Sequence, residues 1–222
     1  MLSYIFPNKC ASCGAIISEG LRVCDECSKG LCRINSVVCK YCGRDILHCT
    51  CRRRKNSFSS NVSVFRYDGS ASNIVKRFKM GKITQLSVYI SEEMSMLIDK
   101  EYRDIDFDCM TFVPSTRISV IRRGFDHTRM LADEISKRVG IPVQKLLKRR
   151  FSLKEQKSLS ALQREQNVRN KYTAIGDITY KRVLLIDDII TTGSTLNECA
   201  RALKQAGVKE VFCATFAATY KK

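Results

Sequence analysis

From residue 61 onward, short stretches typical of strands alternate with stretches that repeat every three to four residues, as a helix does. The strand-like stretches are short and apolar, and they cover residues 62–67, 109–114, 181–188 and 210–219. The helical stretches are amphipathic, and they cover residues 70–82, 84–100, 127–140 and 194–207. Strands separated by helices favour a parallel sheet. The pattern therefore predicts an α/β domain with a mainly parallel sheet flanked by helices.

The clearest part of this pattern runs from residue 181 to residue 219. Its first stretch, "KRVLLIDD", contains four consecutive apolar residues, which is typical of a strand buried on both faces of a parallel sheet. The helix that follows has Gly207 at its C-terminal end, where a glycine commonly stops a helix. The next strand completes a strand–helix–strand unit and leaves Asp187 and Asp188 at the carboxyl end of the first strand. Ligands of open α/β sheets bind at that edge, so we expect a binding site there.

The first 60 residues lack this periodicity and are rich in cysteine. Of the 12 cysteines, nine lie between Cys10 and Cys51. Two C-x2-C pairs can complete a tetrahedral zinc site, and metal binding would supply much of the folding free energy of so short a segment. We therefore expect a Cys-rich zinc-binding module at residues 1–55 and the α/β domain at residues 56–222. The expected structural ligands are Cys10, Cys13, Cys24, Cys27, Cys39, Cys42, Cys49 and Cys51.

The second half of that ligand set is ambiguous. In "HCTC", Cys49 and Cys51 are one residue apart, whereas His48 and Cys51 have the usual two-residue gap. Either Cys49 or His48 could be the fourth ligand, and Cys49 is favoured because thiolates fill the other three positions. The spacing leaves open whether consecutive or interleaved pairs share an ion, and whether one zinc ion binds or two. Cys32 is left over. Three further cysteines lie in the α/β domain and are expected to be buried there as small apolar residues: Cys109, Cys199 and Cys213.

The net charge of +17 indicates the kind of partner. Residues 1–60 carry 10 basic and 4 acidic side chains, so both parts of the chain share the excess. Such a balance favours polyanions, either nucleic acid or phosphorylated metabolites. No apolar run approaches the roughly 18 residues of a membrane span, and the first residues lack the features of a secretory signal. In a reducing compartment, a cysteine cluster indicates metal rather than disulfides. We therefore expect a cytoplasmic protein without a membrane span.

A turn rich in hydroxyl groups, "TTGST", follows the acid pair at residues 191–195. Amide groups at a helix N-terminus and these hydroxyls favour an anion, and Gly193 lets the backbone approach it closely. The turn lacks the lysine of a Walker A loop and the glycine pattern of a dinucleotide site. Carboxylates suit a vicinal diol, so Asp187, Asp188 and the turn together predict a ribose 5-phosphate unit. The alternative is the acid pocket of a receiver domain, which normally follows the first strand and lacks such a turn.

This segment and three others resemble a known family. The stretch "VLLIDDIITTGSTL" is similar to the phosphoribosyl pyrophosphate (PRPP) motif of type I phosphoribosyltransferases. Three further segments resemble segments of the ComF family, which is associated with DNA uptake in competent bacteria. They are "FRYDGSASNIVKRFKMGK", "VPSTRISVIRRGFDHTRMLA" and "QKSLSALQREQNVRN". They occur in the same order as in that family and behind the same Cys-rich module. The resemblance covers nearly the whole chain. Two positions depart from it: Asp126 and His127 stand where relatives usually carry Asn-Gln, and "HCTC" is irregular.

The resemblance implies a type I phosphoribosyltransferase-like fold and a role for each motif. PRPP would bind together with Mg²⁺, with its ribose hydroxyls at Asp187 and Asp188. Its 5-phosphate would be held by Thr191, Thr192, Gly193, Ser194 and Thr195. Its diphosphate would meet the loop at residues 114–117, through Ser115 and Thr116, with Arg117, Arg122 or Arg123 nearby. Residues 156–167 would form a hood over the site. The surrounding segment, residues 144–171, carries 9 basic and 2 acidic side chains, which suits a polyanionic ligand.

Two functions are compatible with these features. The chain is either an enzyme that transfers a phosphoribosyl group from PRPP to an unidentified acceptor, or a non-catalytic factor that senses PRPP or a nucleotide. The second kind of protein would contact single-stranded DNA and DNA-uptake proteins. The acid pair and the turn favour the enzyme, whereas the charge and the zinc module favour the factor. Single-strand binding commonly uses aromatic platforms, and no basic–aromatic repeat is present. His127 could be a general base, although a helix N-cap or a surface position is more usual for such a residue.

Overall fold

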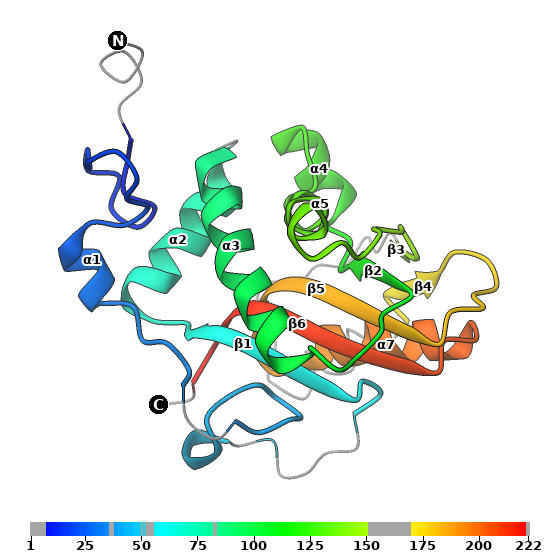
Figure 1. The fold of residues 1–222 in the computed structure, drawn as a ribbon. Coiled ribbons are helices and arrows are strands. Elements are labelled where there is room, and N and C mark those ends of the chain that lie inside the picture. Colours follow the sequence, from blue (N-terminus) through cyan, green and yellow to red (C-terminus); the bar gives the residue numbers. More distant parts are fainter. Residues whose placement is uncertain are drawn as a thin grey trace, which may run out of the picture.

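The computed structural model describes residues 8–35, 38–49, 51, 56–81, 84–150 and 170–220, and a four-stranded sheet runs through it (Figure 1). The strands are β1 (Ser60–Arg66), β2 (Cys109–Phe112), β5 (Arg182–Ile190) and β6 (Glu210–Ala218). Their order is β1-β6-β5-β2, and every neighbouring pair is parallel. This confirms the predicted parallel sheet. β5 and β6 are its inner strands, so the acid pair predicted from the sequence lies on an inner strand.

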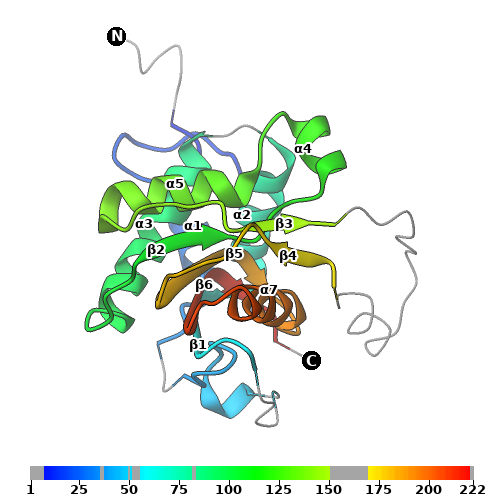
Figure 2. The ribbon, with the colours of Figure 1, turned by 90° about the vertical axis from the view of Figure 1, so that its right-hand side faces the viewer.

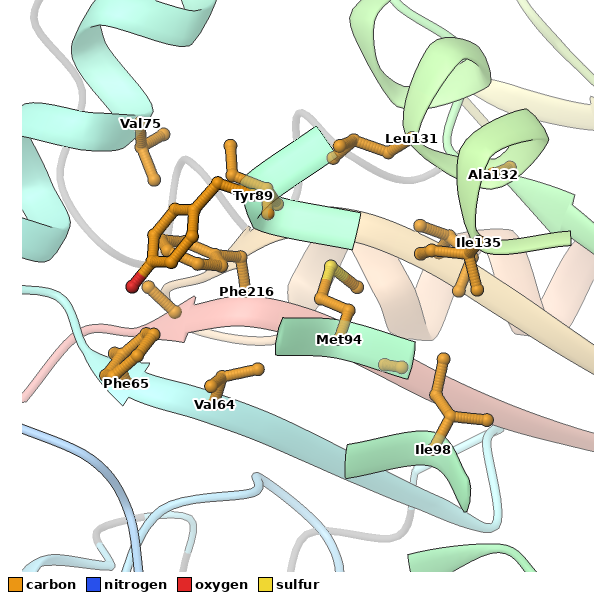
Figure 3. Close-up of a cluster of buried hydrophobic side chains, with 14 of the residues drawn as sticks. Val64, Phe65, Val75, Tyr89, Met94, Ile98, Leu131, Ala132, Ile135 and Phe216 are labelled. Carbon is orange, nitrogen blue, oxygen red and sulfur yellow. The ribbon is translucent and has the colours of Figure 1, made fainter. Parts of the chain in front are cut away.

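Three helices cover one face of this sheet, as Figure 1 shows. They are α2 (Gly69–Met80), α3 (Thr84–Glu101) and α5 (His127–Val139). Residues four apart on the same helix, such as Ile74 and Phe78, face the core and are buried. In this core, the rings of Phe65 and Phe216 meet edge to face with their centroids 5.3 Å apart (Figure 3). The amphipathic period in the sequence therefore corresponds to the helix faces that pack on the sheet.

The opposite face packs against α7 (Ser194–Gln205) and a short antiparallel hairpin (Figure 2). The hairpin consists of β3 (Leu147–Arg149) and β4 (Tyr172–Ala174). Cys109, Cys199 and Cys213 all lie in this second apolar cluster, and each is at most 1% exposed. The expectation that these three cysteines are small buried apolar residues is confirmed.

The helix α4 (Arg117–Arg123) was not predicted from the hydrophobic pattern. Thr116 caps it by accepting a hydrogen bond from Ser119 N at 3.0 Å, and Gly124 ends it with a left-handed φ of 78°. Ile118 and Ile121 of this helix are 67% and 82% exposed. The helix thus buries no apolar face, and the sequence has no core period to reveal it. The strands β3 and β4 have three residues each, which is too few for a recognisable alternation.

The second half of the Cys-rich segment lies along β1, at one edge of the sheet, whereas its first half lies beside α2 (Figure 1). Residues 32–34 run antiparallel to β1. Ile34 N donates to Val64 O at 2.9 Å, and Arg66 N donates to Cys32 O at 2.8 Å. These bonds give hydrogen-bond partners to some of the backbone N–H and C=O groups on the outer edge of β1. The helical elements of the segment are short, α1 (Asp25–Lys29) and the 3₁₀ turn η2 (Ile46–His48).

Ion pairs also join the Cys-rich segment to α3. Arg22 meets Glu92 at 3.2 Å, and Arg33 meets Glu93 on the same helix. The segment is thus attached both to the edge of the sheet and to a helix on its face. Among the described residues, no helix combines the length and the apolar character needed to cross a membrane.

Candidate functional site

The acid pair lies on β5, just beyond the part of this strand that pairs with β2. Val113 N donates to Ile186 O at 3.0 Å. β5 runs on to Ile190, so the strand ends two residues later than the sequence predicts. Asp187 and Asp188 therefore lie within the strand and point to opposite faces of the sheet, because neighbours along a strand alternate. They are only 9% and 4% exposed, so both side chains are buried.

Asp188 is held by two side chains from the helices above the sheet. Its Oδ2 lies 2.8 Å from Nζ of Lys79, near the end of α2, and 3.2 Å from Nε2 of His127, at the start of α5. The candidate residues drawn from the sequence did not include Lys79. A signal was present, because Lys79 follows the buried Val75 by four residues and so shares its face.

The two carboxyl groups carry different charges. Burial, and then the charge of Asp188, raise the pKa of Asp187 to about 8. Burial alone would also raise the pKa of Asp188, but the hydrogen bond from His127 and the charge of Lys79 outweigh it and hold that pKa below its ordinary value. The Asp188 carboxylate in turn raises the pKa of Lys79 against the opposite effect of burial. At neutral pH the pair therefore carries one negative charge, on Asp188, with Lys79 as its counter-ion.

His127 connects the acid pair with the loop at residues 114–117. Its Nδ1 lies 3.2 Å from Nη1 of Arg123 and 3.2 Å from Oγ of Ser115. A guanidinium group can only donate, so Nδ1 is the accepting nitrogen, and Nε2 carries the proton on the side of Asp188 Oδ2, 3.2 Å away. His127 is 9% exposed, and the N-cap of α5 is Asp126. The expectation of a capping or surface histidine is wrong, because the ring is enclosed between Asp188 and Arg123.

Asp126 holds the same loop from the other side. Ser115 donates to it from its backbone N at 3.1 Å and from its Oγ at 2.8 Å. Asp126 also caps α5 by accepting from Thr128 N at 3.2 Å. The pair Asp126–His127 thus contacts both the loop and the acid pair in this chain.

The predicted anion-binding turn lies at the start of α7. Gly193 has a φ of 79°, a left-handed conformation that disfavours residues with a side chain. Among the described residues, a Cβ at this position would meet only Ile190 Cδ1, at 3.6 Å, so backbone conformation rather than close approach explains this glycine. Oγ1 of Thr192 accepts from Ser194 N at 3.3 Å, while Thr191 and Thr192 are exposed. The turn therefore presents hydroxyl groups and helix N-terminal amides to solvent.

A groove of about 1000 Å³ extends from the 114–117 loop to the β3–β4 hairpin. Ser115, Thr116 and Arg117 line it, and Asp126 contributes its only carboxylate among the described residues. Neither the acid pair nor the hydroxyl turn is among the described lining residues. The predicted hood, residues 156–167, lies outside the described residues. The groove is strongly basic, with lining side chains from Arg117, Arg122, Arg129, Lys145, Lys148, Arg149, Arg150 and Lys171.

Eight cysteines of the N-terminal segment form two clusters of consecutive pairs. In each cluster the four sulfur atoms lie within 4.8 Å of one another. Zinc–sulfur bonds of about 2.3 Å in a tetrahedron place sulfur atoms about 3.8 Å apart. The Cys39–Cys51 and Cys42–Cys49 Sγ distances are both 3.6 Å, so the donor set fits a closed, structural zinc site. The clusters are Cys10, Cys13, Cys24 and Cys27, and Cys39, Cys42, Cys49 and Cys51.

The structure places the two candidate ligands in "HCTC" differently. Cys49 belongs to the second cluster, whereas His48 turns its Nδ1 to Oδ1 of Asp45 at 2.5 Å and its ring to Tyr220. Cys32 lies outside both clusters and is exposed.

Comparison with known proteins agrees with this arrangement. The family described as double zinc ribbon domain matches residues 1–56, and the family described as phosphoribosyl transferase domain matches residues 126–222. Competence protein F of Haemophilus influenzae is 30% identical over 226 residues, which cover 93% of this chain and 95% of that protein. The chain belongs to the ComF family.

Other proteins similar to this ComF chain carry related names. DNA utilization protein YhgH of Escherichia coli K12 is 23% identical over 215 residues, which cover 92% of this chain and 94% of that protein. Among solved structures, glutamine PRPP amidotransferase from B. subtilis, complexed with ADP and GMP, aligns with a TM-score of 0.41 and 23% identity. That alignment covers 59% of this chain and 26% of the other, and the family assignment does not rest on it. The zinc ribbon match and the two four-cysteine clusters together support structural zinc in this ComF protein.

Proposed function

We propose that this ComF protein is a cytoplasmic phosphoribosyltransferase that binds PRPP with Mg²⁺ and acts in DNA uptake. The observation that carries the proposal is the carboxylate of Asp188, kept ionised by Lys79 and His127 next to a hydroxyl-rich turn at a helix N-terminus. Such an edge of a parallel sheet suits a ligand with a diol at one end and a phosphate at the other. The cysteine clusters need reduced thiols, which suits the cytoplasm.

In this proposal, each group has a defined task. The ionised Asp188 accepts a hydrogen bond from one ribose hydroxyl, and Asp187 contacts the other. The hydroxyl turn at residues 191–195 holds the 5-phosphate. His127 positions Asp188 rather than serving as a base, because both of its nitrogens are already engaged.

Arg117 and Arg123 would stabilise the leaving group, which is the diphosphate of PRPP. As the bond between C1 of the ribose and the diphosphate breaks, negative charge gathers on the diphosphate, and preorganised cations stabilise it. Arg117 lies on the groove side of the loop that Ser115 anchors, and Arg123 lies beside His127. Mg²⁺ bound with PRPP would offset part of the same charge. The loop, α4 and the acid pair together would thus surround the bond that breaks.

Calorimetry with PRPP and Mg²⁺ tests the assignment. The double variant Asp187→Asn/Asp188→Asn keeps the shape of the site but removes its charge, so measurable binding should be lost. Asp104→Asn/Asp106→Asn makes the same change at exposed positions and should bind like the wild type. Equal affinity of the wild type and the site variant would refute the assignment. Incubation of labelled PRPP with cell extract would then reveal pyrophosphate release and the labelled acceptor.

A second function, binding of single-stranded DNA, is favoured by the basic groove. Among the described residues, eight basic side chains and one carboxylate line this groove, and the names of the relatives refer to competence and DNA utilization. If the contacts are mainly to phosphates, the logarithm of the affinity for an oligonucleotide should fall steeply with the logarithm of salt concentration. Fluorescence anisotropy with Arg129→Gln/Lys145→Gln should show weaker binding and a shallower salt slope. Unchanged affinity in that variant, or a flat salt dependence, would exclude the groove.

A further inference from the structure

Arg44, a residue of the second zinc cluster segment, reaches into the phosphoribosyltransferase domain. It is 6% exposed although its side chain is charged. Its Nε donates to the carbonyl of Thr219 at 2.5 Å, and its Nη2 donates to the carbonyl of Thr191, the first residue of the hydroxyl turn. Thr219 N in turn donates to Ile190 O at 2.9 Å. The guanidinium group therefore bridges the ends of β5 and β6, directly behind the turn.

The zinc knuckle fixes the position of Arg44. The carbonyl of Arg44 accepts from Cys39 N at 2.8 Å, and Gly43 N donates to Cys39 O at 2.8 Å. The carbonyl of Cys42 accepts from Nδ2 of the buried Asn61 at 3.3 Å. At Gly43, with a φ of 66°, a Cβ would lie 2.5 Å from that same Nδ2, so the knuckle packs backbone to side chain against β1. Arg44 thus enters the domain from the turn that carries two cysteines of the second cluster, Cys39 and Cys42.

The contact with Thr191 matters because of the geometry of the peptide group. In a trans peptide the C=O and the following N–H point in opposite directions, and the described backbone contains no cis peptide. When Arg44 holds the Thr191 carbonyl behind the turn, the Thr192 N–H points to the other side, toward the mouth of the turn. The buried positive charge also polarises this peptide and makes its N–H a better donor to an anion.

We propose that Arg44 positions the 5-phosphate turn and thereby couples zinc binding at the second cluster to PRPP binding. The inference rests on the proposed function, because it takes PRPP as the ligand of this turn. Loss of zinc loosens the knuckle, releases Arg44 and leaves the turn without its brace. By linkage, PRPP then raises the affinity of this cluster for zinc by the same factor that zinc raises the affinity for PRPP. Couplings of this kind amount to roughly 5-fold to 150-fold.

The first experiment is calorimetry with PRPP and Mg²⁺ on three zinc-loaded proteins. Arg44→Met keeps the apolar stem but removes both hydrogen bonds, and it should weaken PRPP binding about tenfold or more while zinc content stays at the wild-type level. Arg22→Met makes the same substitution at another link between the zinc module and the domain, far from the turn, and should bind like the wild type. Equal binding by Arg44→Met and the wild type would refute the positioning role.

The second experiment measures zinc affinity by equilibrium competition with a zinc-selective chromogenic chelator. In the wild type, PRPP should strengthen the binding of one zinc ion by the factor found in calorimetry, and in Arg44→Met this effect should disappear. Any direct binding of zinc by PRPP is the same in both proteins and cancels. A zinc affinity that PRPP does not change in the wild type would overturn the coupling. Absence of PRPP binding in the wild type would refute the proposed function itself, which is a different outcome.

Discussion

Replacing Lys79 by Met tests the buried charge balance on which the site depends. The change removes an ammonium group 2.8 Å from a carboxylate that is 5% exposed, and it keeps a side chain of similar length. Of the contacts that Lys79 Nζ and His127 Nε2 make with Asp188 Oδ2, the one from His127 would remain. The protein should be less stable at neutral pH, because an ionised carboxylate stays buried without its counter-ion.

The size of the effect follows from the geometry. Two unit charges at this distance attract by about 6 kcal/mol at an effective dielectric constant of 20. The side chain of Lys79 is 35% exposed, so solvent screens part of this attraction, and His127 remains as a partner of Asp188. We therefore expect a loss of roughly 2–3 kcal/mol in the free energy of unfolding. In a chain of 222 residues this lowers the melting temperature by roughly 5–10 °C.

The assay is chemical unfolding at pH 7, combined in a double-mutant cycle. Asp188→Asn removes the charge that Lys79 balances, so the double variant should lose at least about 1 kcal/mol less than the sum of the two single variants. Lys76→Met, an exposed position on the same helix, should change stability by less than about 0.5 kcal/mol. If Lys79→Met is as stable as Lys76→Met, or if the two site changes are additive, the ion pair does not stabilise the fold as argued.

Three other outcomes follow from the described geometry. Burial raises the pKa of Asp187 to about 8 in the folded protein, whereas the unfolded chain loses this proton at the ordinary pKa of an aspartate. The free energy of unfolding should therefore fall as pH rises from that ordinary pKa to about 8. The melting temperature of Asp187→Asn should therefore improve relative to the wild type between pH 5 and 9; the opposite trend would contradict the raised pKa. Gly207→Ala should cost roughly 2–4 kcal/mol in chemical unfolding, because its φ is 113° and a Cβ would lie 2.3 Å from Ile178 O. Gly176→Ala, with a φ of 72° but open space, should cost only about 1 kcal/mol, and equal costs would exclude the steric explanation. A zinc-selective chelator should lower the melting temperature and speed proteolysis of the Cys-rich segment, and no change would argue against structural zinc.

The sequence was sufficient for the helices with an amphipathic period and for the strands with a short apolar run, which are buried almost throughout. The strands around Val64 and Leu185 and the helices of the sheet faces follow local patterns, so they could be predicted. The helix α4 and the β3–β4 hairpin could not, because the first buries no apolar face and the second is too short to alternate.

The candidate site was predictable only in part, for a similar reason. Asp187, Asp188 and the hydroxyl turn lie close together in the chain, so a local motif reveals them. Arg44 binds carbonyls 147 and 175 residues away, and no local pattern encodes such contacts. The fourth ligand of the second zinc cluster was equally undecidable from spacing, since the turn at Ile46–His48 directs the histidine to Asp45.

The pairing of residues 32–34 with β1 has a consequence for the fate of the protein when zinc is scarce. An uncovered outer strand offers free N–H and C=O groups to any other extended chain, which is a common start of aggregation. In this protein that edge is shielded by backbone from the zinc-dependent segment, through the bonds at Val64 and Arg66. Loss of zinc would therefore do more than unfold a small module, because it would also expose the unpaired outer edge of β1. The supply of zinc would then determine how much of this protein avoids aggregation.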